Sequence, residues 1–192
     1  MKQGVGAVSV RKLAAGRNEA SAGKFLGKLN EMLRDSCLSE PSTKIDEVSR
    51  RTSGNIARLK AKVESARLFI SEVEKMKADG LLDEQAAKAE SLPARTVVSL
   101  ADMLESAYDK AKLAKNSYPL KRVNIAVQVL AGNISTSIIS GTRYPKDDAR
   151  LKDSMMQSRQ SQAASVHEDV CRALDDIVKD LGIAIPASPS LS

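Results

Sequence analysis

The sequence predicts an all-α fold: an antiparallel bundle of four long helices plus a short connecting helix. Its aromatic residues are three Tyr and two Phe among 192 positions, with no Trp. The core must therefore be built from aliphatic side chains and Ala, which suit helices better than a sheet sandwich. Apolar residues also recur three and four positions apart, the spacing of one helix face. We expect a single helical domain over residues 19–182, a flexible basic arm over 1–18 and a loose polar tail over 183–192.

The first two helices are expected over about 20–37 and 43–80. Pro41 separates them, Thr43 and Asp46 resemble an N-capping arrangement, and Gly80 ends the second helix. Apolar residues of the second helix follow the a and d spacing of a heptad repeat. This stripe predicts either the inner face of the bundle or a surface for a partner. Its candidate partner-binding residues are Ile56, Leu59, Val63, Phe69, Ile70 and Val73.

The short connecting helix is predicted over residues 81–92, because Pro93 is expected to end it. A third long helix is predicted after Pro93, and Asn116 with Pro119 supplies its stop signal.

Residues 120–140 fit either a strand or a helix. Their many β-branched side chains favour a strand, whereas an apolar set of helical period runs through about five turns. Because no second convincing strand exists to pair with this one, we predict a helix that ends at Gly141. The last helix is predicted over about 146–181, with Gly182 as its C-terminal cap.

Positive charge is concentrated at the N-terminus. Residues 1–30 contain six Lys and Arg against one Glu, which gives +5 of the net +6. A second group of bases decorates the beginning of the second helix, between Lys44 and Lys62. Such residues can contact phosphates, although no aromatic platform for base stacking lies near them. The candidate nucleic-acid-binding residues are Arg11, Lys12, Arg17, Arg50, Arg51, Arg58 and Lys62.

The sequence predicts no enzyme, no cofactor and no metal site. The single histidine, His167, precedes Cys171 by one helical turn, but zinc would need two more ligands, and Cys37 is the one other soft donor. No Gly-rich phosphate-binding loop and no complete nucleophile–base set is present. Two cysteines fit a reducing compartment, and whether they ever pair stays open.

These observations lead to two hypotheses of function. No stretch approaches the roughly 18–20 apolar residues that span a bilayer, and no signal sequence is evident. We therefore expect a cytoplasmic protein, with export by a route that uses no cleaved signal left open. The first hypothesis is a non-enzymatic interaction protein that binds a protein partner or a second copy through helix faces. The alternative is a nucleic-acid-binding protein that uses the basic arm and the face from Lys44 to Lys62.

Overall fold

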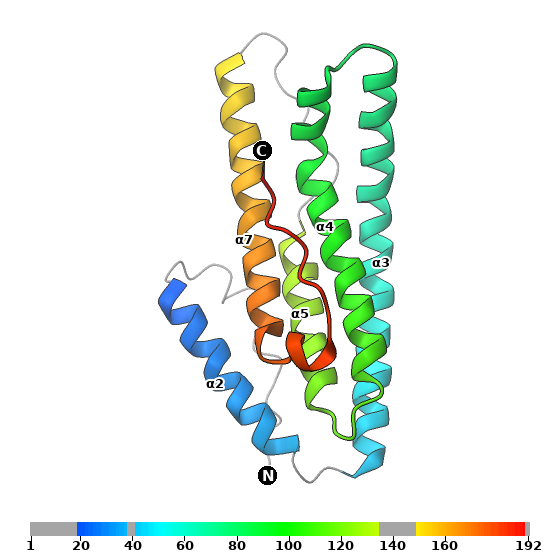
Figure 1. The fold of residues 1–192 in the computed structure, drawn as a ribbon, viewed down its shortest axis with the longest axis vertical. Helices are drawn as coiled ribbons and strands as arrows, with labels where there is room; N and C mark the ends of the chain where they lie inside the picture. The colour runs from blue at the N-terminus through cyan, green and yellow to red at the C-terminus, as the bar shows by residue number, and fades with distance from the viewer. Residues whose placement is uncertain (1–18, 38–40, 135–148, 191–192) are drawn as a thin grey trace.

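The computed structural model describes residues 19–37, 41–134 and 149–190, and all regular structure in these ranges is helical. The helices are α2 (Glu19–Cys37), α3 (Ser42–Ala78), α4 (Glu84–Ala111), α5 (Tyr118–Asn133) and α7 (Ala149–Leu181). Helices α3, α4, α5 and α7 alternate in direction and form an antiparallel bundle, with α2 at its side (Figure 1). The all-α prediction is confirmed, while the predicted basic arm lies outside the described residues.

Pro93 does not end a helix, so the predicted short connecting helix over 81–92 is wrong. Helix α4 runs without a break from Glu84 to Ala111, with Pro93 inside it and buried. The halves before and after the proline both bury small and aliphatic side chains in the same bundle. This burial offsets the roughly 3 kcal/mol that an interior proline costs a helix.

Helix α3 begins near the predicted position but without the predicted cap. Pro41 occupies the capping position in an extended conformation, and no side chain caps the first turn, so Thr43 and Asp46 do not act as predicted. Gly80 and Gly182 both have positive φ, at 73° and 60°, just after α3 and α7. Both glycines therefore end their helices in the left-handed conformation, as predicted.

Helix α5 resolves the ambiguity of residues 120–140 in favour of a helix, but it ends earlier than predicted. Its last residue is Asn133, and Ile134 is extended; residues 135–148 lie outside the described residues. Helix α5 contacts each of the other four helices and is buried on almost every side. Its buried residues are Tyr118, Leu120, Arg122, Val123, Ala126, Val127, Val129 and Leu130.

Helix α5 is much shorter than its neighbours, at 16 residues against 37 in α3. The two helices are thus about 24 and 56 Å long. The Lys62 amine donates to the Ala131 carbonyl at 3.1 Å, which places the end of α5 beside the middle of α3. Above this level the described helices of the bundle are α3, α4 and α7 (Figure 1).

A buried ion pair occupies this upper part of the bundle. Arg159 of α7 donates from Nη1 to Glu90 of α4 at 2.8 Å, and from Nη2 to the Glu90 carbonyl at 3.4 Å. Its guanidinium also lies over the ring of Phe69 from α3, 5.8 Å from the ring centre. We call Phe69, Glu90 and Arg159 the Arg159 cluster. It joins the three helices where α5 no longer fills the space between them.

The C-terminal segment 183–190 has no regular structure and lies against the bundle (Figure 1). Lys110 of α4 donates to the Gly182 carbonyl, and Ile183 packs against the core. The His167 Nε2 atom lies 2.9 Å from the Pro186 carbonyl oxygen. These contacts hold the segment predicted as a loose tail to α4 and α7.

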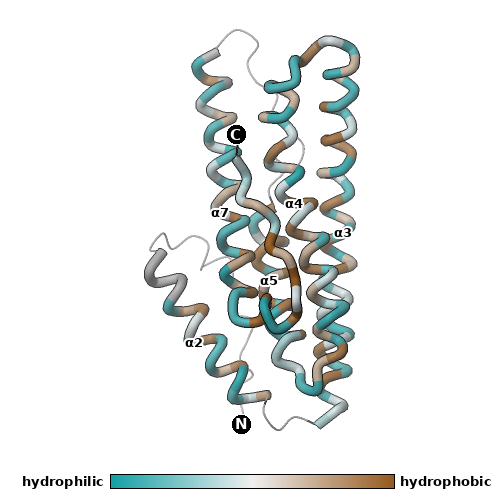
Figure 2. The backbone as a smooth tube through the Cα atoms, viewed as in Figure 1, coloured by the Kyte–Doolittle hydropathy of each residue, from teal (hydrophilic) through white to brown (hydrophobic). Residues whose placement is uncertain are grey.

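Hydrophobic positions recur along the helices between hydrophilic ones, as amphipathic helices require (Figure 2). The side chains that meet in the centre are mainly Leu, Val and Ala. No helix in the described ranges combines the length and the apolarity that crossing a membrane requires.

Candidate functional site

A row of cations lies on the exposed side of the first half of α3. Lys44, Arg51 and Arg58 follow one another at intervals of seven residues, close to two helical turns, so they share one side of the helix over about 21 Å. Arg50 lies next to this row. None of these four side chains forms an ion pair or a hydrogen bond with another described residue. They are free to bind an anion.

The packing of the inner face of α3 on α5 determines which side of α3, and therefore which cations, face the solvent. Thr52 and Ile56 are buried on that face, and the Thr52 hydroxyl donates to the Val48 carbonyl at 2.8 Å. Asn55 donates to the side-chain oxygen of Asn124 on α5, also at 2.8 Å. These contacts fix α3 against α5, and they leave the row of cations next to the N-terminal turn of α5.

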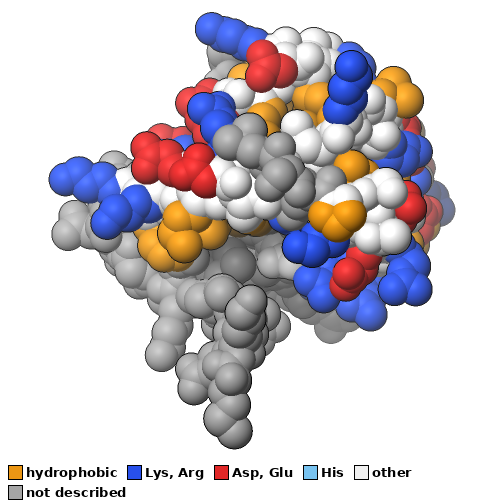
Figure 3. All heavy atoms as spheres, turned by 90° about the horizontal axis from the view of Figure 1, so that it is seen from below, with side chains coloured by type: hydrophobic (Ala, Val, Ile, Leu, Met, Phe, Trp, Pro, Cys, Tyr) orange, Lys and Arg blue, Asp and Glu red, His pale blue; other side chains and the backbone are white. Residues whose placement is uncertain are grey.

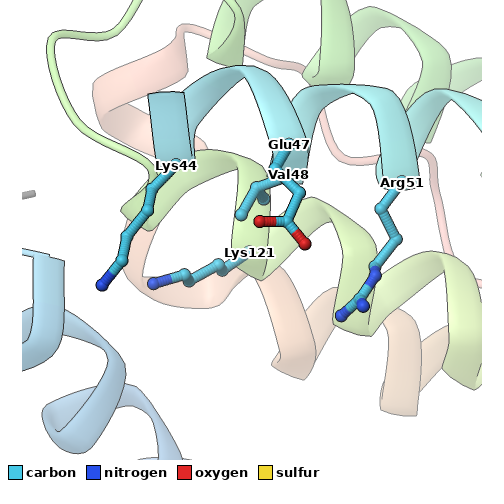
Figure 4. A pocket seen from close by; sticks show the side chains of 5 residues that line it. All are labelled: Lys44, Glu47, Val48, Arg51 and Lys121. Carbon is cyan, nitrogen blue, oxygen red and sulfur yellow. The ribbon is translucent and has the colours of Figure 1, made fainter. Parts of the chain in front are cut away.

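Lys121 of α5 joins the row at a surface pocket of about 220 Å³. The lining residues are Lys44, Glu47, Val48, Arg51 and Lys121. Figure 4 shows that Lys44, Glu47, Arg51 and Lys121 all extend to the same side of the two helices.

A second pocket, of about 290 Å³, continues along α3. Its lining residues are Glu47, Arg50, Arg51, Gly54, Asn55 and Arg58. Because the two pockets share Glu47 and Arg51, they form one continuous surface. We call its cations the basic face: Lys44, Arg50, Arg51, Arg58 and Lys121. From below, Lys and Arg side chains gather around an acidic group on the side of the molecule where α3 lies (Figure 3).

The chemistry of the basic face is that of anion binding. Exposed guanidinium and ammonium groups outnumber the single carboxylate of Glu47 in both pockets. Arginine can hold a phosphate through two parallel hydrogen bonds, and lysine acts as a point charge. Among the described residues, neither pocket has an aromatic side chain in its lining on which bases could stack.

The structure brings together only part of the predicted nucleic-acid set. Arg50, Arg51 and Arg58 lie on the basic face, whereas Lys62 lies further along α3 and donates to a carbonyl of α5. Arg11, Lys12 and Arg17 lie outside the described residues. Sequence reasoning missed Lys121, which is a residue of another helix. No local pattern indicates which side of α5 meets α3.

The predicted partner-binding stripe is the inner face of the chain's own bundle. Ile56, Leu59, Val63 and Val73 are buried in the core, where α3 packs against α4 and α5. Phe69 and Ile70 are half-buried, and Phe69 belongs to the Arg159 cluster. A partner cannot reach the four buried side chains in the closed bundle. These residues therefore give no support to the protein-partner hypothesis.

His167 and Cys171 lie close together, but their surroundings do not form a reactive site. The Cys171 sulfur is 3.8 Å from His167 Nε2. Burial, together with the negative charge of Asp175, raises the pKa of Cys171 from its ordinary value of 9.0 to about 11, so the thiol stays protonated at neutral pH. In the described part of the chain, no group of three or more His, Cys, Asp or Glu residues is placed to hold a metal ion.

No protein family, curated protein or solved structure matches this chain. Its function is therefore inferred from its own geometry. The basic face is a place in the described structure where exposed cations of α3 and the half-buried Lys121 of α5 converge.

Proposed function

We propose that this chain is a non-enzymatic binding protein that holds the phosphate backbone of a nucleic acid on its basic face. The observation that carries the proposal is the convergence of Lys44, Arg51 and Lys121 on one pocket, beside a single acidic residue. Two of these cations come from α3 and one from α5, so the packing of the bundle creates the site. The N-terminal arm, with its excess of Lys and Arg, would add further charge.

The length of the row suits a polymeric anion better than a small one. Each strand of a B-form duplex carries one phosphate per about 3.4 Å of axis, so a row of about 21 Å passes about six phosphates. Since the described residues of the face offer no stacking surface, we expect contacts to the backbone to account for binding, and these carry no sequence information. We expect DNA and RNA of unrelated sequences to bind with similar affinities.

Salt dependence is the first measurement, because each phosphate contact releases a counterion. With four or five contacts to a single strand, log K should fall against log salt with a slope of about −3. We would measure the fluorescence anisotropy of a labelled 20-nucleotide RNA, and of a DNA of the same sequence, between 50 and 200 mM salt. If neither binds at 50 mM salt, the proposal is wrong.

Two matched triple variants distinguish the contribution of the basic face to binding from that of net charge. The test variant is Lys44→Glu/Arg51→Glu/Lys121→Glu. The control is Lys75→Glu/Arg150→Glu/Lys179→Glu, which changes the net charge equally at exposed positions elsewhere. The test variant should lose at least tenfold in affinity, because each phosphate contact contributes to the electrostatic term. Equal losses in both variants, with helix content unchanged in both, would show that net charge alone drives binding.

A further inference from the structure

The last turns of α2 cover the side of α5 that borders the basic face. Cys37 of α2 has its sulfur 3.2 Å from the Lys121 amine and 3.3 Å from the Ser117 hydroxyl. One turn earlier, the guanidinium of Arg34 lies over the Tyr118 ring, 5.6 Å from its centre. Ser117 and Lys121 are four residues apart, as are Tyr118 and the next cation, Arg122. The end of α2 thus lies across two adjacent rows of α5.

Arg122 is fully buried, at 0% exposure, and none of its three side-chain nitrogens makes a hydrogen bond. The nearest carboxylate oxygen, from Asp176 of α7, is 3.7 Å from Nη2, and the same oxygen accepts from the Tyr118 hydroxyl at 3.4 Å. Burial lowers the pKa of the guanidinium, and Asp176 offsets this effect in part. A buried guanidinium with unfilled donors favours any state in which an oxyanion can reach it.

Helix α2, of 19 residues, contacts the bundle less extensively than the other four helices contact one another. It packs against α5 and α7 along one side and diverges from the bundle toward its N-terminal end (Figure 1). Phe25 and Met32 remain 39% and 69% exposed. On the inner side, Asn30 is buried with no partner for its side-chain oxygen. Closing α2 therefore leaves polar atoms of both Asn30 and Arg122 unsatisfied while part of its apolar surface stays outside.

We propose that α2 is a displaceable cover of the basic face, and that Arg122 is a further phosphate-binding residue which becomes accessible when α2 moves away. The proposal rests on the proposed function and names the regulation of that same site. Displacement releases Lys121 from Cys37 and exposes Arg122 beside it, so the basic face extends around α5. A phosphodiester then supplies the hydrogen-bond acceptors that Arg122 lacks in the closed state.

A disulfide that fixes α2 to α5 tests the proposal in the full chain. In Ser117→Cys, the new sulfur takes the place of a hydroxyl that lies 3.3 Å from the Cys37 sulfur. We would measure binding of the labelled 20-nucleotide RNA at 50 mM salt with diamide-oxidised and with dithiothreitol-reduced protein. The oxidised variant should bind at least tenfold more weakly, and reduction should restore its affinity. Wild-type protein under the same two conditions is the control.

Arg122→Met in the Ser117→Cys background tests the residue itself. In reduced protein it should weaken binding severalfold and make the salt slope shallower by about one, as the loss of one phosphate contact requires. In oxidised protein it should change neither quantity, because the covered side chain does not contact RNA. Equal effects in both states would overturn the role of Arg122.

Hydrogen exchange of wild-type protein provides a measurement that depends on no engineered bond. With RNA bound, the amides of α2 should exchange faster than in the free protein, because binding favours the displaced state. Slower or unchanged exchange of these amides would overturn the proposal that α2 is displaced when RNA binds. If oxidised and reduced Ser117→Cys bind equally while the triple charge reversal still abolishes binding, the cover fails and the proposed function stands. If the triple reversal has no effect, the proposed function itself fails.

Discussion

Two buried arginines of this bundle have opposite surroundings. Arg159 is 4% exposed, and its guanidinium meets a carboxylate, a carbonyl and an aromatic ring from two other helices. Arg122 is 0% exposed, makes no hydrogen bond and has its carboxylate at 3.7 Å. Burial alone therefore does not distinguish a structural cation from one available for binding. The terminal nitrogens do: both Nη atoms of Arg159 donate hydrogen bonds, whereas no side-chain nitrogen of Arg122 does, and each unfilled donor costs free energy that a ligand can recover.

The helices around each arginine explain the difference. Arg159 lies where α3, α4 and α7 enclose it from three sides. Arg122 of α5 faces Asp176 of α7, and the end of α2 packs on its neighbours Tyr118 and Lys121. The first arginine joins three helices, whereas the second is the residue that we propose becomes accessible when α2 moves.

The largest expected effect is that of Arg159→Met. The substitution leaves Glu90 buried without its counter-charge, so the free energy of unfolding should fall by about 3–5 kcal/mol. For a chain of this size, that corresponds to a fall in Tm of roughly 6–20 °C. Thermal unfolding followed by circular dichroism measures it. Glu90→Leu/Arg159→Met should recover most of the loss, and a single variant as stable as wild type would remove the distinction between the two arginines.

Hydrogen exchange of the wild-type protein should show that α2 opens more easily than the middle of α4. Amides of α2 should exchange about 100-fold faster than those in the middle of α4, which corresponds to a difference in opening free energy of about 3 kcal/mol. Residue-resolved exchange at neutral pH measures both sets in one sample. Equal protection of the two helices would mean that α2 opens only when the whole bundle unfolds.

Arg122→Met should change the free energy of unfolding in the opposite direction to Arg159→Met. It removes a buried charge whose donors are unfilled, and the remaining Asp176 carboxylate is 39% exposed and stays hydrated. We expect the free energy of unfolding to rise by about 1–3 kcal/mol. Urea denaturation of the two Met variants side by side is the measurement. A destabilised Arg122→Met would show that the ion pair with Asp176 is a structural contact after all.

The smallest expected effect is the dependence of stability on pH that Tyr118 and Cys171 cause. Burial raises the pKa of Tyr118, beside Arg122, above its ordinary value of 10.0, and raises that of Cys171 to about 11. The folded state holds these protons more tightly than the unfolded state, so stability is full below pH 9 and falls as the pH rises toward 11. Cys171→Ala should remove on the order of 1 kcal/mol of this dependence. Denaturation curves at pH 8 and pH 10.5 measure the change.

Much of the fold could be predicted from the period of apolar residues. The stripe from Ile56 to Val73 lies in the core because a helix face that is apolar at every third or fourth residue must be covered. The prediction that Pro93 ends a helix was wrong because it used local helix propensity alone. It left out the free energy gained when both halves of α4 pack in one bundle. The end of α5 at Asn133 was missed because the apolar period continues past it.

The candidate site was harder to predict than the fold. Arg51 and Arg58 were found because they belong to a charged helix segment, whereas Lys121 joins them only through the packing of α5 on α3. Arg122 follows Lys121 in a segment that looks like ordinary basic surface. A signal was present, since Arg122 shares a helix face with Ala126 and Val129, which are both buried.

The partners of α2 also set the order in which the chain can assemble during synthesis. Of the described helices, α2 is made before the others, but it docks on α5 and α7, and 144 residues separate Cys37 from the end of α7 at Leu181. At about 5–20 residues per second, roughly 7–29 s pass before its docking surface is complete. For that interval α2 is a nascent amphipathic helix without a place to pack. Any molecule that recognises it therefore has access to every newly made chain before the bundle closes.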